Sequence, residues 1–557
     1  METMSRQSPA AGGGRSSGGG AMGSGAAGRG RGGAGAGRRA GGAALAAGLA
    51  AGLGLVRAGG EVLVLKDGLQ VGGGEARWAA TVNGSVSGPT IFAMEGQELA
   101  VEVANEFMAG ARASSVHWHG MFQKGTPFMD GVPGVSFCGI LPGKSFLYNF
   151  TAEPAGTHWY HSHSGSQYAD GLAGALIVRP APGAEVPEWE SDPDLKEEVL
   201  LALELAPKTA ETEYTLLKSG EDLGGKYGGK MLGDVPWPKW LLNGEPDGTA
   251  SFRLAPGTTT RFRFINGAAN YLVVLRSGLP MQLVMTDPGQ YVEPTPVDAI
   301  RAAIGERYDF LVTIPEDAEP TAYQLTLSDE FGTNSFTIGT ILVGDAKPSD
   351  ASPALVSEGE VINTYGFPAP WRGEPAPPQG REIPLQLNGT DEPYSWKVGD
   401  VALEEPAVPL MLSGGRFGFD EDRVTTESVA VGEVVDFVLE NPTGMGHPFH
   451  LHGNEFWVIE TWGEWPGSNV AASDPAQRRD TVQVPAKGGA RVRMRSTNPG
   501  PWFMHCHIDF HLLAGMATVV LVGDESEWPT VPEGTQLCGN APDGLQELYA
   551  ERPDILG

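Results

Sequence analysis

Long helices, long apolar runs and cysteines are all scarce in this 557-residue chain. From Glu61 onward helical periodicity is rare, and the best candidate for a short helix is residues 543–552. No apolar run after residue 60 reaches the roughly 18 residues that a membrane-spanning helix needs, so we expect a body without a transmembrane segment. Hydrophobic residues make up 41% of the chain and charged residues 19%, which indicates that most of it is globular rather than disordered.

Positive charge is scarce as well. The chain has 38 Lys and Arg residues against 68 Asp and Glu residues, and its formal net charge is −30. Residues 1–60 hold seven arginines and one glutamate, so the remainder is more acidic still. Such a surface repels nucleic acid and anionic membranes, and we predict neither as a partner.

The N-terminal segment, residues 1–60, differs in composition from the rest. Residues 1–42 are almost entirely Gly, Ala, Ser and Arg and cannot bury a core. An apolar stretch at 43–56 follows two arginines and ends near small residues, which resembles a secretory signal over about 38–58. We therefore predict a secreted, extracellular protein. A membrane anchor or an organelle-targeting sequence would have a similar composition, and both alternatives stay open.

Short apolar runs broken by Gly, Pro and Asn dominate from residue 61 onward and predict β-strands. In "ARVRMRS", for example, arginines at 491, 493 and 495 share one face and Val492 and Met494 the other, as in a half-buried strand. Many short strands with regular turns indicate β-sandwiches or barrels. Pro-rich segments at 179–194 and 346–360 are the predicted linkers. The predicted parts are a low-complexity segment, three domains each suited to one β-sandwich, and a tail, at 1–60, 61–180, 181–345, 346–530 and 531–557.

All eleven histidines fall in four short segments, "HWHG" (117–120), "HWYHSH" (158–163), "HPFHLHG" (447–453) and "HCHIDFH" (505–511). Core histidines would scatter along the chain, so this clustering indicates metal binding. In a strand, residues i and i+2 share a face. The segments therefore present four His-x-His pairs, which are His117 with His119, His161 with His163, His450 with His452, and His505 with His507. Eight imidazoles exceed what one zinc or copper ion can use, and they predict a cluster of several metal ions between the first and third domains.

A second donor set lies on the opposite side of the same strands. Cys506 points away from its flanking histidines, and His447 is an odd number of residues from His450. Cys506, His447 and His511 make a trigonal His₂Cys set, with Met516 available as a long axial ligand, which is the blue-copper pattern. Residues 505–507 would then give electrons a short covalent path between the two sites. The spacing of His158 turns it away from the cluster and predicts a packing or supporting residue.

The other two cysteines, Cys138 and Cys538, have no role in this scheme. In an exported protein, two such cysteines suggest a disulfide. Composition alone leaves their pairing open.

In this order and spacing, the four histidine segments resemble the copper-binding signatures of multicopper oxidases, and the three-domain laccases match best. Other segments, such as "TVNGSVSGPTI", "GTHWYHSHSGSQYADGL" and "INGAANYLVVL", are also similar to laccase segments. The resemblance covers about residues 61–540. It implies an all-β protein of three consecutive cupredoxin-like Greek-key domains, each a β-sandwich or barrel. It also implies a disulfide between Cys138 and Cys538.

The resemblance further implies four copper ions. A type 1 copper would be bound by His447, Cys506 and His511, with Met516 as its axial ligand. A type 2 copper would be bound by His117 and His450. The type 3 pair would use His119, His161, His163, His452, His505 and His507. Strand parity yields the same two groups but cannot divide the eight cluster histidines between types 2 and 3.

The implied reaction is the repeated one-electron oxidation of a reducing substrate at the type 1 copper, coupled to reduction of O₂ to two waters at the trinuclear cluster. O₂ reduction needs protons, and Asp130 and Asp509 match positions where the family carries acids near the cluster. Glu204 falls where laccases have a carboxylate that takes the phenolic proton. A thioether ligand such as Met516 stabilises Cu(II) and implies a low-to-middle potential, which favours easily oxidised phenols, diphenols or aromatic amines.

Two other functions stay open. A relative that oxidises Fe(II) or Cu(I) could also use an acid at Glu204, so that residue does not distinguish the donors. A non-catalytic blue-copper electron carrier would need only the type 1 ligands and not the eight cluster histidines. Sequons at Asn83, Asn149 and Asn388 are compatible with a glycosylated secreted enzyme, and we expect a monomer.

Overall fold

The computed structural model describes the chain from Val56 onward, with internal gaps. The described residues are 56–57, 61–72, 75–108, 113–220, 231–232, 235–236, 239–246, 248–329, 335–351, 361–362, 365, 368–391, 394–406, 408–413, 425–464, 468–471, 474–535 and 537–538. All of them belong to one unit, residues 53–557. The predicted signal segment, apart from residues 56–57, and the predicted helix at 543–552 lie outside the described residues.

Two sheets form the N-terminal part of this unit. The first has the order β1 (Val56–Arg57), β4 (Gly88–Met94), β9 (Ala173–Arg179), β8 (Gly156–His161), β6 (His117–His119), and the second has the order β3 (Glu75–Val82), β2 (Glu61–Gly72), β5 (Glu98–Asn105), β7 (Ser145–Thr151). Alternate residues of β5, such as Leu99 and Val101, are buried in one cluster with Trp118 and Tyr160. These two aromatic residues alternate with His117, His119 and His161, so these three histidines face away from this core.

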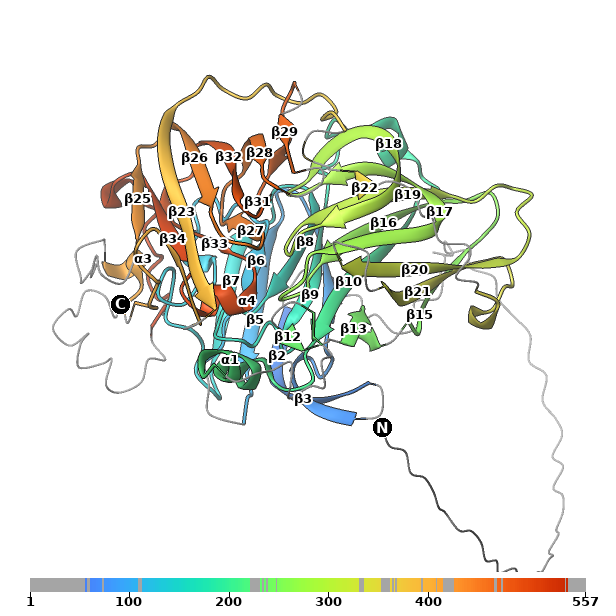
Figure 1. The fold of residues 1–557 in the computed structure, drawn as a ribbon, viewed down its shortest axis with the longest axis horizontal. Helices are drawn as coiled ribbons and strands as arrows, with labels where there is room; N and C mark the ends of the chain where they lie inside the picture. Colours follow the sequence, from blue (N-terminus) through green and yellow to red (C-terminus); the bar gives the residue numbers. More distant parts are fainter. Residues whose placement is uncertain are drawn as a thin grey trace, which may run out of the picture. The chain divides into compact units, whose positions relative to one another are not determined.

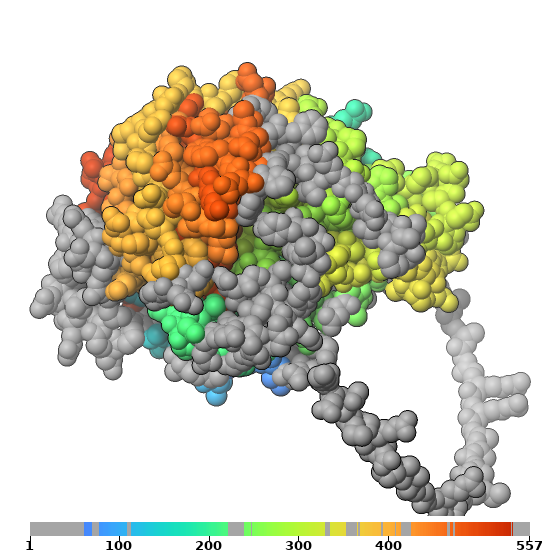
Figure 2. Space-filling view, viewed as in Figure 1, coloured from blue at the N-terminus to red at the C-terminus, as the bar shows by residue number. Residues whose placement is uncertain are grey.

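The middle part is built on one sheet of eleven strands. Its path is β14 (Glu245–Pro246), β13 (Lys239–Leu242), β10 (Lys196–Leu205), β16 (Thr259–Asn266), β19 (Arg307–Thr313), β17 (Val273–Thr286), β20 (Thr321–Asp329), β21 (Ser335–Val343), β15 (Ala250–Leu254), with β18 (Gln290–Ala302) joining β17 to β22 (Val361–Ile362). A separate ribbon pairs β11 (Met231–Leu232) with β12 (Val235–Pro236). Helix α1 (Ala210–Lys218) is preceded by the N-cap residue Thr209, whose side chain accepts a hydrogen bond from the backbone N–H of Thr212. Its outer face is exposed, as the green surface in Figure 2 shows.

Two more sheets form the C-terminal part. One has the order β24 (Tyr394–Val398), β23 (Arg381–Asp391), β26 (Val434–Asn441), β32 (Gly488–Arg495), β28 (Phe456–Trp462), β29 (Val470–Ala471), with β30 (Arg478–Arg479) on β28, and the other has the order β25 (Thr426–Val429), β34 (Ala517–Val522), β33 (Gly500–Cys506), β27 (His447–Leu451), β31 (Thr481–Val484). The remaining elements are short, namely α3 (Leu410–Ser413), α4 (Asp509–Leu513), η1 (Pro127–Met129), η2 (Glu188–Ser191), η3 (Pro348–Asp350) and η5 (Glu525–Glu527).

Strand β32 corrects one detail of the sequence prediction. Val492 and Met494 are buried as expected, and Arg495 is exposed. Arg493 is buried as well, although it was predicted on the open face. Its guanidinium donates two hydrogen bonds of 2.6 and 2.7 Å to the carboxylate of Asp436, so its charge is compensated inside the protein.

The predicted all-β class is confirmed, with three consecutive cupredoxin-like parts, of which the first and last have two main sheets each and the middle one has a single main sheet. The histidine-bearing strands β6, β8, β27 and β33 lie together between the outer strands in Figure 1. In β6 and β8 His117 stands opposite His161, and in β27 and β33 His450 stands opposite His505.

The domain limits stay a prediction. Strand β9 ends at Arg179 and β10 begins at Lys196, with η2 between them. Most of the second predicted linker, residues 352–360, lies outside the described residues. Within the described residues, no helix has the length and apolar character needed to cross a membrane.

Candidate metal centre

Stacked imidazole rings join the N-terminal strand pair to the C-terminal one. The ring of His119 stacks on that of His450 with centroids 3.7 Å apart, and the ring of His117 stacks on that of His452 at 3.8 Å. Further ring contacts link the other members of the four His-x-His pairs. All eight are buried except His163, which is half-buried. The structure therefore brings together eight histidines from segments about three hundred residues apart.

Backbone carbonyls orient four of these rings. The Nδ1–H groups of His117, His161, His450 and His505 donate at 2.9–3.0 Å to the carbonyls of Asp130, Ser162, Asp480 and Cys506, respectively. A carbonyl oxygen can only accept, so the hydrogen lies on Nδ1 and the lone pair on Nε2. Partners of this kind fix the tautomer of metal-binding histidines. Among the described residues, Nε2 of His117, His161 and His450 has no hydrogen-bond partner although it is buried.

Nitrogen atoms of neighbouring rings approach one another closely. His452 Nε2 lies 3.1 Å from His505 Nε2, and His119 Nδ1 lies 3.2 Å from His507 Nε2. Two nitrogens bound to one ion at about 2.0 Å with a near-tetrahedral angle are about 3.3 Å apart. Three histidine groups have donor atoms within 4.8 Å of one another, namely His117, His119 and His161; His117, His450 and His452; and His163, His452 and His505. This donor set fits several metal ions.

Burial favours the neutral form of His119, His450 and His505. Desolvation, followed by repulsion from neighbouring histidines, lowers the pKa of His119 and of His450 well below the ordinary value. Desolvation likewise lowers the pKa of His505 to about 3. At neutral pH these three rings therefore offer the unprotonated nitrogen that a metal ion requires.

Asp130, at the end of η1, contacts two rings of the cluster. Its Oδ2 accepts a hydrogen bond of 2.8 Å from Nδ1–H of His452, and its Oδ1 lies 3.3 Å from Nδ1 of His117. The side chain is fully buried. Asp130 thus touches one histidine from the N-terminal part and one from the C-terminal part.

His447, Cys506 and His511 form the second donor set. His447 Nδ1 lies 3.2 Å from His511 Nδ1, and each nitrogen lies 3.6 Å from Cys506 Sγ. The hydroxyl of Thr443 donates to Asn441 and accepts from Nε2–H of His447, so the Nδ1 lone pair of His447 faces the sulfur. Burial raises the pKa of the Cys506 thiol, and a thiolate at this position needs a cation beside it. The three donors suit one soft metal ion.

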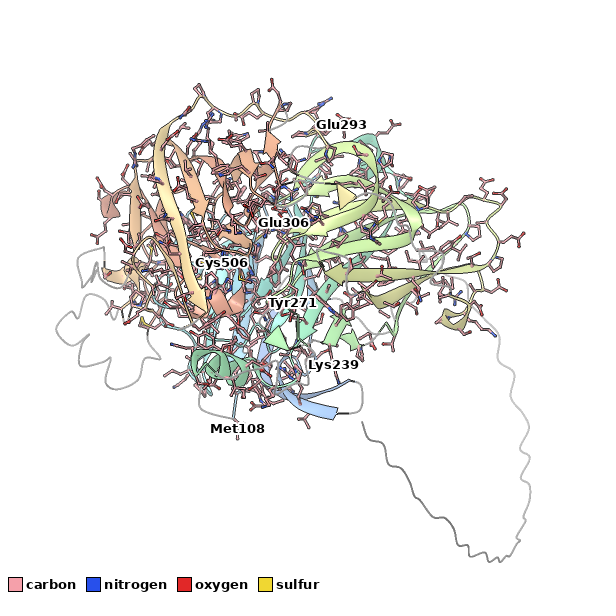
Figure 3. All side chains as sticks on the ribbon, in the orientation of Figure 1. Met108, Lys239, Tyr271, Glu293, Glu306 and Cys506 are labelled. Carbon is pink, nitrogen blue, oxygen red and sulfur yellow. A yellow bond between two sulfur atoms is a disulfide. The ribbon has the colours of Figure 1, made fainter. Side chains whose placement is uncertain are left out.

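Two further residues pack around this second set. Met516, the predicted axial ligand, is fully buried; its backbone N–H donates to the carbonyl of His511, and its carbonyl accepts from the N–H of Cys506. Trp396 of β24 stacks on the ring of His511 with centroids 4.0 Å apart. Because Cys506 lies between His505 and His507, three consecutive residues connect the two donor sets. Figure 3 labels Cys506 inside the ribbon.

Asp509 and Glu204 lie on the α4 side of the cluster. Asp509 lines a small cavity together with His161, His163, His505 and His507, and burial raises its pKa well above the usual value. Glu204 Oε1 accepts a hydrogen bond of 2.8 Å from Asn270. Burial raises the pKa of Glu204 to about 8. In the described part of the chain no hydrogen bond joins Glu204 to His511.

His158 lies apart from both donor sets. Its Nε2–H donates to the carbonyl of Pro154 at 2.9 Å, and within the described residues no ring contact links it to another histidine. The predicted pairing of Cys138 with Cys538 is confirmed by a disulfide in the structure.

Sequence reasoning missed several residues at the site. Asp480 Oδ1 lies 3.7 Å from His119 Nε2 and 3.8 Å from His450 Nδ1, and Arg307 forms a bidentate ion pair with Asp480. A Cβ on Gly305 would lie 2.9 Å from Cε1 of His119. The one signal in the sequence is Arg307, a charged residue at the start of the apolar strand "RYDFLVT". It suggests an internal ion pair, but the sequence does not identify the acid in that pair.

The fold and the site define a class of protein. It is a β-sandwich metalloprotein in which a His₂Cys set is joined, through adjacent residues of one strand, to a cluster of eight histidines. Family models described as multicopper oxidase match residues 65–183, 212–342 and 377–526. The chain belongs to the multicopper oxidase family. Its members are copper-binding enzymes that react with O₂ and a reducing substrate.

Proteins that are similar to this chain include a laccase and multicopper oxidases described as acting in iron transport or import. The chain is 30% identical over 478 residues to Laccase-4 of Trametes villosa, covering 80% of this chain and 86% of that protein. It is 30% identical over 484 residues to the iron transport multicopper oxidase fio1 of Schizosaccharomyces pombe, covering 82% of this chain and 74% of that protein. A solved structure of Fet3p, described as a multicopper oxidase that functions in iron import, is similar in fold, with a TM-score of 0.71 at 24% identity, covering 86% of this chain and 95% of that one.

Proposed function

We propose that this protein is a laccase-like oxidase that couples one-electron oxidation of phenols, diphenols or aromatic amines to four-electron reduction of O₂ to water. The observation that carries the proposal is the pair of donor sets joined by residues 505–507. Bound copper would supply the electron transfers, accepting single electrons at the His₂Cys set and delivering four to O₂ at the histidine cluster. An electron carrier would need only the first set, so the eight histidines favour catalysis.

We assign four copper ions to these donors. His447, Cys506 and His511 would hold the type 1 copper with Met516 as the axial ligand. His117 and His450 would hold the type 2 copper. The two close nitrogen pairs, together with the group of His163, His452 and His505, support a division of the type 3 ligands into His119, His161, His507 and His163, His452, His505.

Two carboxyls would supply protons for water formation. Asp130 accepts a hydrogen bond from His452, so it is close enough to the cluster to deliver a proton there. Asp509 lies in the cavity beside the type 3 ligands, and burial raises its pKa, which favours the protonated form that can donate. The two acids would act beside different histidines of the same cluster.

The surroundings of the type 1 ligands favour a neutral aromatic donor. Trp396 stacks on His511, and Tyr394 lies next to both rings. Glu204, with a pKa of about 8, is neutral at pH 7 and can exchange a hydrogen bond with a phenol. A divalent cation would instead need ionised carboxylates.

Oxidation of Fe(II) or Cu(I) is the second candidate. It is supported by the similarity to fio1, described as an iron transport oxidase, which matches this chain as well as the laccase does. The strong negative charge of the chain would also attract cations.

Secretion and glycosylation complete the proposal. A disulfide forms in oxidising compartments, which agrees with export. Of the sequons, Asn83 and Asn149 are exposed and Asn388 is half-buried, and the amides of Asn83 and Asn388 donate to the carbonyls of Val62 and Gly399, respectively. Asn149 is therefore the better acceptor.

The donor is tested by steady-state kinetics under O₂ with a diphenol, Fe(II) and Cu(I) as alternative reductants. We expect the highest kcat/KM for the diphenol, with four electrons consumed per O₂. A much higher kcat/KM for Fe(II) or Cu(I) would replace the laccase assignment by a metal-ion oxidase. Copper-loaded protein that consumes no O₂ with any of these donors would contradict both.

A further inference from the structure

The middle part of the molecule contains no histidine, yet it contacts the copper-ligand cluster directly. The turn between β18 and β19 brings Gly305 against the rings of His119 and His507, and Arg307 follows two residues later. Glu306, between them, is labelled in Figure 3 where the middle strands meet the C-terminal strands. This contact has no role in the ligand assignment above.

Arg307 connects all three parts of the molecule. Its Nε–H donates to the carbonyl of Thr157 in β8 at 3.0 Å. Its two terminal nitrogens donate to Oδ1 and Oδ2 of Asp480, between β30 and β31, at 2.7 and 2.6 Å. Both side chains are fully buried. A bidentate arrangement of this kind holds a carboxylate in one orientation.

The carboxylate so held faces two cluster histidines. Oδ1 of Asp480 is 3.7 Å from Nε2 of His119 and 3.8 Å from Nδ1 of His450, and the backbone carbonyl of Asp480 accepts from that same Nδ1–H. Thr481 donates a further hydrogen bond of 2.9 Å to Oδ1. Asp480 therefore lies beside one histidine of β6 and one histidine of β27.

His119 differs from the other rings in the nitrogen that it turns inward. Its Nδ1 lies 3.2 Å from Nε2 of His507, so its ligand nitrogen is Nδ1 and its hydrogen belongs on Nε2. Among the described residues, no carbonyl accepts from this Nε2, in contrast to the Nδ1–H groups of the carbonyl-bound rings. Within the described part of the chain, the carboxylate at ion-pair distance from this Nε2 is that of Asp480.

We propose that Arg307 and Asp480 are positioning residues for the trinuclear copper cluster, holding His119 in the tautomer and orientation that direct Nδ1 to a type 3 copper and His450 toward the type 2 copper. Neither residue touches the reacting atoms. This inference rests on the copper assignment of the proposed function. It gives the middle part of the chain a defined role in the oxidase.

The backbone at Gly120 supports this role. Gly120, directly after His119, has φ +92°, and a Cβ there would come closest to Nδ1 of His158 and would lie 2.7 Å from Nη2 of Arg307. Glycine therefore leaves room for both the imidazole of His158 and the guanidinium of Arg307 beside the strand that carries His119.

The test uses the full-length, copper-loaded variants Asp480→Asn and Arg307→Lys. Lysine keeps the positive charge but cannot form the bidentate pair, so Arg307→Lys should lose less cluster copper than Asp480→Asn. The matched control is Asp436→Asn, which breaks the buried bidentate pair with Arg493 away from the histidines. Readouts are copper per chain after competition with a chelator, the blue type 1 band, the type 3 absorption and the type 2 electron paramagnetic resonance signal.

We expect Asp480→Asn to bind cluster copper about 10–100-fold more weakly, as is typical when a residue supporting a metal-bound histidine is lost. The blue band and the anaerobic rate of type 1 reduction should be unchanged, while reoxidation by O₂ slows. Asp436→Asn should lower the melting temperature but keep the cluster signals in its folded fraction. If Asp480→Asn does not fold, Arg307→Lys carries the same comparison.

The inference would be overturned if Asp480→Asn and Arg307→Lys both kept the cluster copper content, the spectra and the reoxidation rate of the wild type. It would also be overturned if Asp436→Asn lost as much cluster copper as Asp480→Asn. A wild-type protein without a trinuclear cluster would instead contradict the proposed function itself. The two failures are therefore distinguishable.

Discussion

Three of the buried carboxyls near the copper ligands have different surroundings. Asp130 accepts a hydrogen bond from a cluster ring. Burial raises the pKa of Asp509 and that of Glu204. Desolvation penalises the charged form of an acid unless donors or cations compensate it. The sequence could nominate these acids by position but could not assign their charge, because burial depends on the packing of distant segments.

Glu204 should make stability depend on pH. Burial raises its pKa from 4.5 to about 8, so between these pH values the folded protein keeps a proton that the unfolded chain has lost. The stabilisation is fully present below about pH 4.5 and is lost toward pH 8, at up to about 1.4 kcal/mol per pH unit. Glu204→Gln removes this dependence. Urea unfolding of both copper-loaded proteins should show the variant gaining relative to wild type up to pH 8, and parallel profiles would contradict the assigned pKa.

Met516 should set the potential of the type 1 copper. A thioether stabilises Cu(II), and leucine offers no donor, so Met516→Leu is expected to raise the reduction potential by tens of millivolts or more. Potentiometric titration followed through the blue band measures this change. Met504→Leu, at a buried methionine that is not a proposed ligand, is the control. Equal potentials in Met516→Leu and wild type would show that Met516 is not an axial ligand.

At the scale of elements, the period-two alternation of strands predicted which metal-ligand donors face the same side. In β33 it separates His505 from Cys506, and the structure places these residues in different donor groups. Alternation failed for burial in β32, where Arg493 is buried because Asp436 on the neighbouring strand compensates its charge. Strand pairing decides such contacts, and alternation within one strand carries no information about the partner strand.

The turn between β18 and β19 is predicted to be sensitive to a single methyl group. Gly305 has φ +87°, and the Cβ of Gly305→Ala would lie 2.9 Å from His119 and 3.0 Å from His507. We expect loss of cluster copper with a normal blue band, measured by copper content and spectra. Gly96→Ala is the control, because Gly96 has φ +81° but nothing within 4 Å of its Cβ position. Equal copper content in the two variants would exclude a role for this contact.

At the scale of the whole molecule, the disulfide ties the N-terminal part to the chain beyond the last strand. Cys138 and Cys538 are 400 residues apart in sequence. Replacing both by serine is expected to lower the free energy of unfolding by roughly 2–5 kcal/mol. Calorimetry should show a lower melting temperature with unchanged copper content at low temperature. An unchanged melting temperature would mean that the packed interfaces alone hold this segment.

The sequence by itself determined the strand-rich class and the two donor sets, because side-chain alternation and donor chemistry are local properties of short segments. It also placed His447, Cys506 and His511 together and apart from the paired histidines. Only the tertiary structure decided which nitrogen of each ring faces inward, which carboxyls are buried, and that Arg307 and Asp480 reach the cluster. These features arise where strands more than a hundred residues apart pack and exclude water, and no periodicity within one segment encodes that contact.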